Sequence, residues 1–572
     1  MIPMARKVAI GIQDFGNIIE NNYFYIDKTR FISEWWNSGD AVTLITRPRR
    51  FGKTLNLSML EYFFSNKYEG RGDLFEGLDI WKDEVFRKLQ GTYPVIFLSF
   101  AGVKQTTYEK IKKIINLLIQ KTFNQYEWLI RDDSFTKADK DFFHQVSDEM
   151  DDATAAMSLN MLCEWLSRHY GKKCIVLLDE YDTPMQEAYV NGYCDELAKY
   201  TRALFNNTFK TNPSLERAIM TGITRVSKES IFSDLNNLNV ITTTSNEYAI
   251  SFGFTEGEVF AAMDEQGIPQ PEKQKVKSWY DGFTFGRMTD IYNPWSIISF
   301  LAKRQYGAHW ANTSGNSLVS KLLKESSRKV KMDFEELLKG NCIKAEIDEQ
   351  IVFSQLNRKR NAIWSLLLAV GYLKVVEKKN IWAMNEGQAS TTVYRLALTN
   401  LEVKVMFRDM ILEWFDNEDS FGDFVSAMFT GNVREMNRYM NEVALATFSY
   451  FDAGKHPSGK KEPERFYHGF VLGLLVDKAG SNMVKTNRES GYGRYDVVME
   501  PRNVDDVAVI MEFKVFDPED EEKELADTAD AALRQIEEKK YDTDLLQRGI
   551  PAERIYKYGF AFEGERSLIK KG

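Results

Sequence analysis

The chain has 572 residues, which is too long for one hydrophobic core, so we expect three or four domains. Its 44% apolar and 27% charged residues are typical of a globular protein, and no apolar run reaches the roughly 18 residues that span a bilayer. Four cysteines without a CxxC pair and five scattered histidines argue against disulfides and zinc, and indicate a reducing, cytoplasmic setting without a membrane partner. The net charge of −9 does not indicate a surface coated with cations for nucleic acid, although local basic clusters are present and the charge alone does not decide this.

Within residues 1–252, short β-branched or apolar runs alternate with amphipathic segments. This alternation of strands and helices predicts an α/β fold, with a parallel sheet that helices cover on both faces. The predicted strands are 41–46, 94–100, 173–178 and 217–221, and the clearest helix between them is 108–123.

The middle of the chain is mainly helical in its pattern. Helices at 255–263, 274–280 and 292–301 predict a helical, lid-like region over 253–340. A winged-helix-like region is expected over 341–451, from a helix and short strand at 361–376, a strand at 393–396 and a helix at 402–415.

A segment rich in glycine, proline and lysine, 452–463, is the predicted linker to the last domain. Residues 464–572 then form a separate small α/β domain. Its predicted elements are a helix at 464–479, strands at 495–500 and 507–515, a helix at 521–540 and a strand at 556–562.

A phosphate-binding loop is predicted between the strand 41–46 and the helix 54–64. Gly52 lets the backbone approach phosphate, and the helix that follows directs its N–H groups at the anion. Lys53 would supply a positive charge to the β- and γ-phosphates, and the Thr54 hydroxyl suits Mg²⁺. Arg50, in the same loop, is a further candidate for nucleotide binding. The motif GxxxxGK[ST] requires glycine at position 47, where this chain has arginine, so the entry of the loop is weakened or altered.

A second nucleotide motif follows an apolar run, 174–178, which ends in Asp179 and Glu180. In this arrangement Asp179 would hold Mg²⁺ through water and Glu180 would polarise the attacking water. The alternative is a core strand followed by an acidic helix cap. Both motifs together, in this order, predict ATP binding.

The strand that starts at 217 has a polar tip. Thr221 or Thr224 is a candidate sensor of the γ-phosphate, and Arg225 is a candidate arginine finger, in cis or in trans. A strand end with a solvated arginine is the slightly favoured alternative.

Two carboxylates and a lysine form a second predicted site near the C-terminus. Strand alternation places Glu512 and Lys514 on one face, and a turn at 501–506 would bring Asp496 beside Glu512. Asp496 and Glu512 are suitable ligands for Mg²⁺ or Mn²⁺, and Lys514 would orient the attacking water. Glu464 is a further candidate ligand, and Gln535 would hold the lysine or the substrate. The alternative is a buried Glu–Lys ion pair on a hairpin.

The pattern of Asp496 followed by Glu512-Phe513-Lys514 resembles the PD-(D/E)XK nuclease superfamily. The whole chain resembles bacterial proteins that join a predicted AAA-ATPase-like domain to such a nuclease domain. The matching segments are 25–29 (YIDKT), 47–54, 178–182 (LDEYD), 279–282 (WYDG), 292–296 (YNPWS) and 487–496. The resemblance implies an AAA-like P-loop sheet at the N-terminus and a restriction-endonuclease-like fold at the C-terminus. The family's loop also tolerates arginine at position 47.

By position, the resemblance assigns nucleotide binding to Gly52, Lys53, Thr54, Asp179 and Glu180, and the nuclease reaction to Asp496, Glu512 and Lys514. We therefore expect ATP and Mg²⁺ or Mn²⁺ as cofactors, and an ATP-regulated phosphodiesterase that cleaves DNA. Two alternatives stay open. In one, the chain is a nucleotide-dependent switch or scaffold whose nuclease fold binds a partner or nucleic acid without cleavage. In the other, the ATPase-like half is an inactive scaffold. A homo-oligomer is compatible with each.

Overall fold

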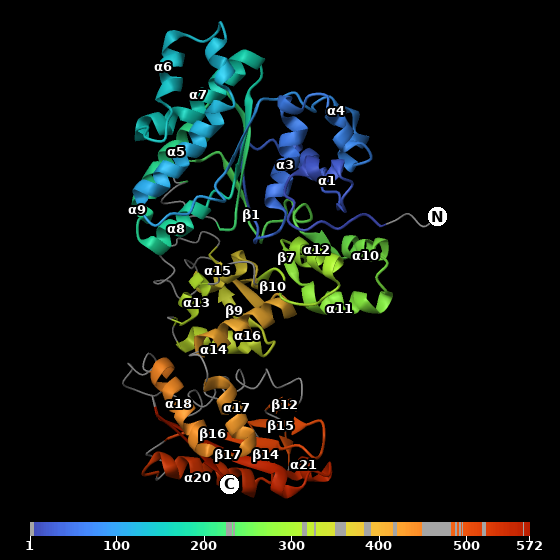
Figure 1. Cartoon of the computed structure of the whole chain (residues 1–572), viewed down its shortest axis with the longest axis vertical. Coiled ribbons are helices and arrows are strands. Elements are labelled where there is room, and N and C mark those ends of the chain that lie inside the picture. Colours follow the sequence, from blue (N-terminus) through green and yellow to red (C-terminus); the bar gives the residue numbers. More distant parts are fainter. Residues whose placement is uncertain are drawn as a thin grey trace. The chain divides into compact units, whose positions relative to one another are not determined.

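The computed structural model describes residues 5–224, 232, 235–311, 317–324, 326, 328–348, 362–381, 391–415, 420–448, 482–486, 489–490, 493–494, 496–516, 522–563 and 566–572. The chain divides into two compact units (Figure 1). The first comprises residues 1–326 and 336–406, and the second comprises 327–335 and 407–572. Among the helices of these residues, none combines the length and the apolar character needed to cross a membrane.

A five-stranded parallel sheet lies at the centre of the first unit. Its order is β2-β3-β4-β1-β5, and the strands are β1 (Val42–Thr46), β2 (Val95–Ser99), β3 (Cys174–Asp179), β4 (Leu215–Gly222) and β5 (Leu238–Ile241). The four predicted strands are confirmed, and β5 was not predicted. Because β1 and β3 both flank β4, their carboxyl ends lie at the same edge of the sheet.

Helices cover both faces of this sheet, as the alternating pattern predicts. Figure 1 shows one group of helices on one side and a second group on the other. The first group is α5 (Tyr108–Asn124), α6 (Lys137–Gln145), α7 (Asp152–Tyr170), α8 (Thr183–Asn191) and α9 (Cys194–Phe205). The second is α1 (Phe15–Glu20), α3 (Lys53–Phe64) and α4 (Glu84–Arg87). Buried aromatic side chains, among them Phe15, Trp35 and Phe63, fill the core on the α3 side.

The lid-like region combines three helices with a small antiparallel sheet. The helices α10 (Glu256–Glu265), α11 (Gln270–Tyr280) and α12 (Pro294–Lys303) correspond to the three predicted ones. The sheet, in the order β6-β8-β7, was not predicted. Its strands β6 (Phe254–Thr255), β7 (Phe283–Phe285) and β8 (Met288–Tyr292) are too short to produce a strand pattern.

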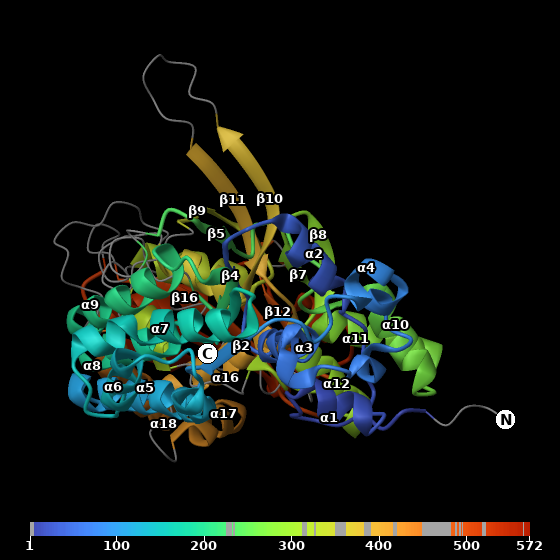
Figure 2. The same ribbon diagram turned by 90° about the horizontal axis from the view of Figure 1, so that it is seen from above.

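Further helices and a three-stranded antiparallel sheet, β10-β11-β9, follow, and the elements predicted at 361–376, 393–396 and 402–415 are among them. The winged-helix-like arrangement of this region stays a prediction. The elements are α13 (Ser317–Lys324), α14 (Arg328–Leu338), β9 (Ile343–Glu346), α15 (Ala362–Ala369), β10 (Leu373–Ile381), β11 (Thr391–Leu398) and α16 (Leu401–Phe415). Figure 2 shows β10 and β11 as a long two-stranded ribbon.

The second unit is built on a mixed sheet with the order β12-β15-β16-β17-β18. The strands are β12 (Asn482–Thr486), β15 (Val497–Pro501), β16 (Ala508–Val515), β17 (Ile555–Glu563) and β18 (Arg566–Lys571). A separate short pair is formed by β13 (Glu489–Ser490) and β14 (Gly493–Arg494). The predicted antiparallel pairing of β15 with β16 is confirmed.

Residues of β16 alternate between the two faces of this sheet. Val509, Met511 and Phe513 pack against α17 (Ser420–Thr430) and α18 (Val433–Phe448). Ala508 and Ile510 pack on the opposite face, which α20 (Leu525–Glu538) and α21 (Thr543–Gln547) cover. By the same alternation, Glu512 belongs to the α20 face. The predicted linker 452–463 and the helix 464–479 lie outside the described residues.

Candidate functional site

The loop 47–52 joins β1 to α3 in the first unit, as predicted. Gly52 has a φ of +80°, a conformation that favours glycine, and a Cβ there would meet no atom within 4 Å. Its carbonyl accepts the first helical hydrogen bond of α3, from Asn56 at 2.9 Å. Arg50 also has a positive φ, 65°. The loop therefore turns sharply into a helix N-terminus, the geometry that exposes backbone N–H groups to an anion.

Lys53 is buried in the curve of this loop. Its Nζ donates to the carbonyls of Arg47 at 3.0 Å and of Pro48 at 2.9 Å. Burial lowers the pKa of Lys53, while the carboxylates of Glu180 and Asp179 oppose this shift. The ammonium group thus lies among the loop carbonyls and the acidic residues at the end of β3.

Asp179, the last residue of β3, is completely buried beside the loop. Thr54 donates its hydroxyl hydrogen to Oδ2 at 2.8 Å, and Thr221, on β4, donates to Oδ1 at 2.7 Å. Burial raises the pKa of Asp179, and these two hydroxyl groups act in the opposite direction. Two of the predicted Mg²⁺ ligands, Thr54 and Asp179, are therefore in direct contact.

Asp182, which was not among the predicted site residues, organises the polar tip of β4. Its Oδ2 accepts from the N–H groups of Ile223 at 3.0 Å and Thr224 at 2.9 Å, and from the Thr224 hydroxyl at 3.0 Å. Burial raises the pKa of Asp182. The Thr224 hydroxyl is thus engaged by Asp182 and the Thr221 hydroxyl by Asp179. An acidic residue three positions after Asp179 was the available signal for Asp182.

Glu180 and Arg225 complete the predicted nucleotide residues. Glu180 has a φ of 50°, and it accepts a hydrogen bond from the hydroxyl of Thr183 at 3.2 Å. A left-handed backbone at a residue other than glycine is strained, and such strain is concentrated at functional sites. Arg225 lies outside the described residues.

A cavity of about 430 Å³ opens beside the loop, within the size range of small-molecule sites. Gly52, Lys53, Thr54 and Glu180 line one part of it. Apolar side chains line another, including those of Ile12, Phe24, Phe254 and Trp295. The guanidinium of Arg50 lies 4.3 Å from the ring centroid of Trp295. A polar wall beside an apolar wall suits a ligand with phosphate groups and a flat base.

In the second unit, β15 and β16 bring the predicted carboxylates together. Val497 pairs with Met511, so Asp496 comes opposite Glu512. Asp496 accepts a hydrogen bond at Oδ2 from the N–H of Phe513 at 3.0 Å. Burial raises the pKa of Asp496, whereas this hydrogen bond and the charge of Lys514 act in the opposite direction. Glu512 is buried, and Lys514 is partly buried two residues further along β16.

Gln535, on α20, donates a hydrogen bond from Nε2 to Oε1 of Glu512. The same Nε2 also donates to the hydroxyl of Tyr541 at 3.2 Å. Burial raises the pKa of Tyr541, and the carboxylates of Glu512 and Asp496 raise it further. Tyr541 was missed, because a tyrosine after a predicted helix carries no signal of its own. Glu464 lies outside the described residues.

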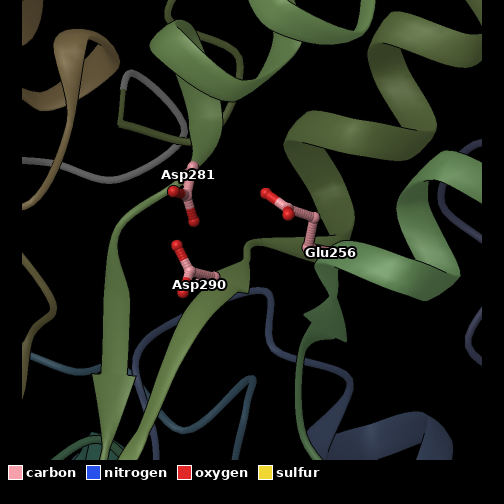
Figure 3. A group of neighbouring side chains, drawn as sticks. All are labelled: Glu256, Asp281 and Asp290. Atoms are coloured by element: carbon pink, nitrogen blue, oxygen red, sulfur yellow. The ribbon is translucent and has the colours of Figure 1, made fainter.

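Three further carboxylates gather in the lid-like region. Figure 3 shows Glu256, Asp281 and Asp290 with their carboxylates directed toward one another, and the ligand atoms lie within 4.8 Å of each other. The Lys277 ammonium contacts Glu256 and lies 3.6 Å from Asp290 and 4.0 Å from Asp281. Burial and the neighbouring Asp290 raise the pKa of Asp281 to about 6. Lys277 offsets part of the negative charge of the three carboxylates. The cluster is therefore accounted for as a salt-bridge network.

The two units define a class of protein in which a P-loop-type nucleotide-binding sheet is joined to a nuclease-type domain. Residues 9–232 match the family of predicted AAA-ATPases, and residues 462–572 match the PD-(D/E)XK nuclease superfamily. The two matches lie in the segments where the resemblance places the two domains, so the expected domain architecture is confirmed. It is also 26% identical over 576 residues to a protein of Azotobacter chroococcum mcd 1 described as "uncharacterized protein in vnfD 5′ region", covering 99% of this chain and 98% of that protein.

Proposed function

We propose that the chain is an ATP-regulated, metal-dependent nuclease that cleaves phosphodiester bonds in DNA. The observation that carries the proposal is the meeting of Asp496, directly before β15, with Glu512 on β16, where Lys514 lies on the same strand face as Glu512. The match of residues 462–572 to the PD-(D/E)XK nuclease superfamily supports the reaction class. The contact between Thr54 and Asp179 supports a nucleotide site in the same chain.

The donor set of the second unit fits Mg²⁺ or Mn²⁺, because both ions prefer oxygen ligands and two carboxylates meet here. A bound divalent cation would supply positive charge to the pentavalent phosphate and acidify the attacking water. Lys514 orients this water. Gln535 fixes the Glu512 carboxylate by its hydrogen bond, and Tyr541 in turn orients Gln535.

In the nucleotide site, Lys53 neutralises charge on the β- and γ-phosphates, while Thr54 and Asp179 are the residues that suit Mg²⁺. Glu180 polarises the attacking water from the end of β3. ATP binding then regulates cleavage.

The nuclease reaction is tested with the full chain on single- and double-stranded DNA and RNA, with Mg²⁺ or Mn²⁺ and with or without ATP. We expect metal-dependent cleavage of DNA that Asp496→Ala and Lys514→Ala abolish while ATP binding is retained. Lys523→Ala, at an exposed lysine before α20, is the matched control and should cleave normally. If the wild-type chain cleaves none of these substrates with either metal, the nuclease proposal is wrong and the switch interpretation replaces it.

The nucleotide site is tested separately by ATP titration. Lys53→Ala should weaken ATP binding by about tenfold to a hundredfold, since a hydrogen-bonded charge contributes roughly 1.5–3 kcal/mol. Lys67→Ala, at an exposed lysine just after α3, is the control and should bind normally. Glu180→Gln should retain binding and lose hydrolysis. Unchanged affinity in Lys53→Ala would contradict the P-loop assignment, whatever the cleavage assay gives.

A further inference from the structure

Arg47 stands where the P-loop motif has glycine, yet its side chain turns away from the nucleotide cavity. Arg49 and Arg50 line the cavity of about 430 Å³, whereas Arg47 does not and is completely buried. Its backbone N–H donates to the carbonyl of Gly222 at 3.1 Å, which continues the pairing of β1 with β4. The side chain of Arg47 is therefore not a ligand for phosphate.

The guanidinium of Arg47 is held by backbone carbonyls of three positions. Nη1 donates to Thr46 at 3.0 Å and to Thr242, which follows β5, at 2.6 Å. Nη2 donates to Glu247 at 3.2 Å. The entry of the loop is thus fastened to the segment 242–247, at the outer edge of the sheet.

Two aromatic rings cover the same guanidinium, that of Phe285 in the lid-like region and that of Phe252 just before this region. The central carbon of the guanidinium lies 4.6 Å from the ring centroid of Phe285 and 5.9 Å from that of Phe252. Phe285 also contacts Phe51, near the other end of the loop, with ring centroids 5.3 Å apart. The hairpin of β7 and β8 therefore holds the loop at both ends.

Burying the Arg47 guanidinium costs free energy, which indicates that this side chain serves to hold the loop in position. Burial lowers the pKa of Arg47 to about 9, so the group remains a cation at neutral pH. Its Nε has no hydrogen-bond partner among the described residues, which adds to the cost. The consequence for the site is at the backbone carbonyl of Arg47, because this carbonyl accepts a hydrogen bond from the Lys53 ammonium. Fixing Arg47 therefore also fixes an acceptor of Lys53.

We propose that Arg47 is a positioning residue of the nucleotide site, which sets the loop and Lys53 by fastening residue 47 to the segment 242–247 and to the hairpin of β7 and β8. In a loop with glycine at this position, backbone freedom alone shapes the entry. In this chain the Arg47 side chain shapes the entry of the loop. Nucleotide affinity therefore depends on Arg47, although its side chain does not contact the nucleotide. The inference rests on the proposed nucleotide binding.

The decisive experiment restores the consensus glycine. We expect Arg47→Gly to weaken ATP binding by about tenfold or more, since a charged group and its hydrogen bonds are lost. Arg47→Lys keeps the cation but cannot span acceptors on both sides, so its affinity should be intermediate. Millimolar guanidinium should restore part of the affinity of Arg47→Gly, whereas sodium at the same ionic strength should not.

A matched control separates positioning from loss of fold. Arg217, near the opposite end of β4, donates to the carbonyls of Trp35 at 3.1 Å and Trp36 at 2.6 Å and lies 4.4 Å from the ring centroid of Trp36. Arg217→Gly should lower the melting temperature by a similar amount and leave ATP affinity unchanged.

Two outcomes overturn the inference, and they are distinguishable. If the wild-type chain binds ATP and Arg47→Gly binds it equally well or better, Arg47 has no positioning role and the proposed nucleotide function stands. If the wild-type chain does not bind ATP, the proposed nucleotide function fails and this inference fails with it. Should Arg47→Gly not fold, the order of affinity between the wild-type chain and Arg47→Lys decides the question.

Discussion

Thr54 and Asp179 lie 125 residues apart in sequence, and the hydroxyl of Thr54 donates a hydrogen bond of 2.8 Å to Oδ2 of Asp179. The contact follows from the order of the sheet, in which β1 and β3 both neighbour β4. Because all three strands are parallel, residues that follow β1 meet residues that end β3. The other oxygen of Asp179 accepts from Thr221 on β4, so one carboxylate links the ends of β3 and β4 to the first turn of α3.

The Thr54–Asp179 contact predicts a difference between two substitutions of Thr54. Thr54→Ala removes the hydroxyl from the pair and should weaken Mg²⁺-dependent ATP binding by about tenfold, at the rate of roughly 1.5 kcal/mol for a hydrogen bond to a charged group. Thr54→Ser retains the hydroxyl and should bind ATP normally. Titrations of ATP with Mg²⁺ and with EDTA measure the effect, which should be small in EDTA. Equal binding by Thr54→Ala and Thr54→Ser in Mg²⁺ would contradict the role of the hydroxyl.

The sequence predicts the sheet and the loop because both have local signals. Residues 42–46 and 174–179 are buried along their whole length, and in the sequence they appear as runs of mainly β-branched or apolar residues. The strand β5 was missed, since it has only four residues and the three before Ile241 are only partly buried. The position of Arg47 could not be predicted either, because its acceptors at 242 and 247 are about 200 residues away and are backbone atoms.

The same distinction holds for the second unit. Alternation along β16 predicts that Glu512 and Lys514 share a face, and the hairpin predicts the approach of Asp496. Tyr541 enters the cluster only through the packing of α20 on the sheet, which no local pattern encodes. The residues of the motif were therefore predictable, and so was the involvement of Gln535, although its partner in the structure is Glu512 and not the lysine. Tyr541, which depends on packing alone, was not predictable.

The hydrogen bonds of Gln535 predict a graded effect on nuclease activity. Gln535→Ala should raise the metal concentration needed for half-maximal cleavage by about tenfold, because residues that orient a metal ligand typically contribute tenfold to a hundredfold. Tyr541→Phe removes only the acceptor of one neutral hydrogen bond, about 1 kcal/mol, and should have an effect of about fivefold. Cleavage is measured over a titration of Mg²⁺ or Mn²⁺.

Tyr556→Phe, on β17, is the control for loss of a tyrosine hydroxyl in the same unit. An effect of Tyr541→Phe as large as that of Gln535→Ala would contradict an action through Gln535.

Replacing Gly282 by alanine is expected to cause a large loss of stability. Its φ is +131°, and a Cβ there would lie 2.0 Å from the carbonyl oxygen of Thr399. Gly282→Ala therefore combines backbone strain with a clash against backbone, and should lower the free energy of unfolding by about 3 kcal/mol. Gly257→Ala, in α10, has no atom within 4 Å of its Cβ and should gain about 0.5–1 kcal/mol. Urea denaturation of both variants checks the pair, and a mild effect of Gly282→Ala would show that the turn can move.

Glu402 predicts that the stability of the first unit falls as pH rises toward neutrality. The carboxylate of Glu402 is completely buried, and it accepts from the hydroxyl of Ser296 at 2.8 Å and from the N–H groups of Trp310 and Ala311. Burial raises the pKa of Glu402 to about 7, from an ordinary value of 4.5. Between these pH values the folded state binds a proton that the unfolded chain has released, so the free energy of unfolding decreases with increasing pH.

Glu402→Gln removes this dependence, because the amide stays neutral at every pH and can still accept one hydrogen bond. Relative to the wild-type chain, the variant should gain about 2–3 kcal/mol between pH 5 and pH 8, at roughly 1.36 kcal/mol per unit of pKa. Urea denaturation at pH 5, 6, 7 and 8 measures this difference, and Glu164→Gln, at an exposed glutamate of α7, is the control for the same substitution elsewhere. A constant difference between Glu402→Gln and the wild-type chain across this range would contradict the prediction, since it would mean that Glu402 binds no extra proton in the folded state.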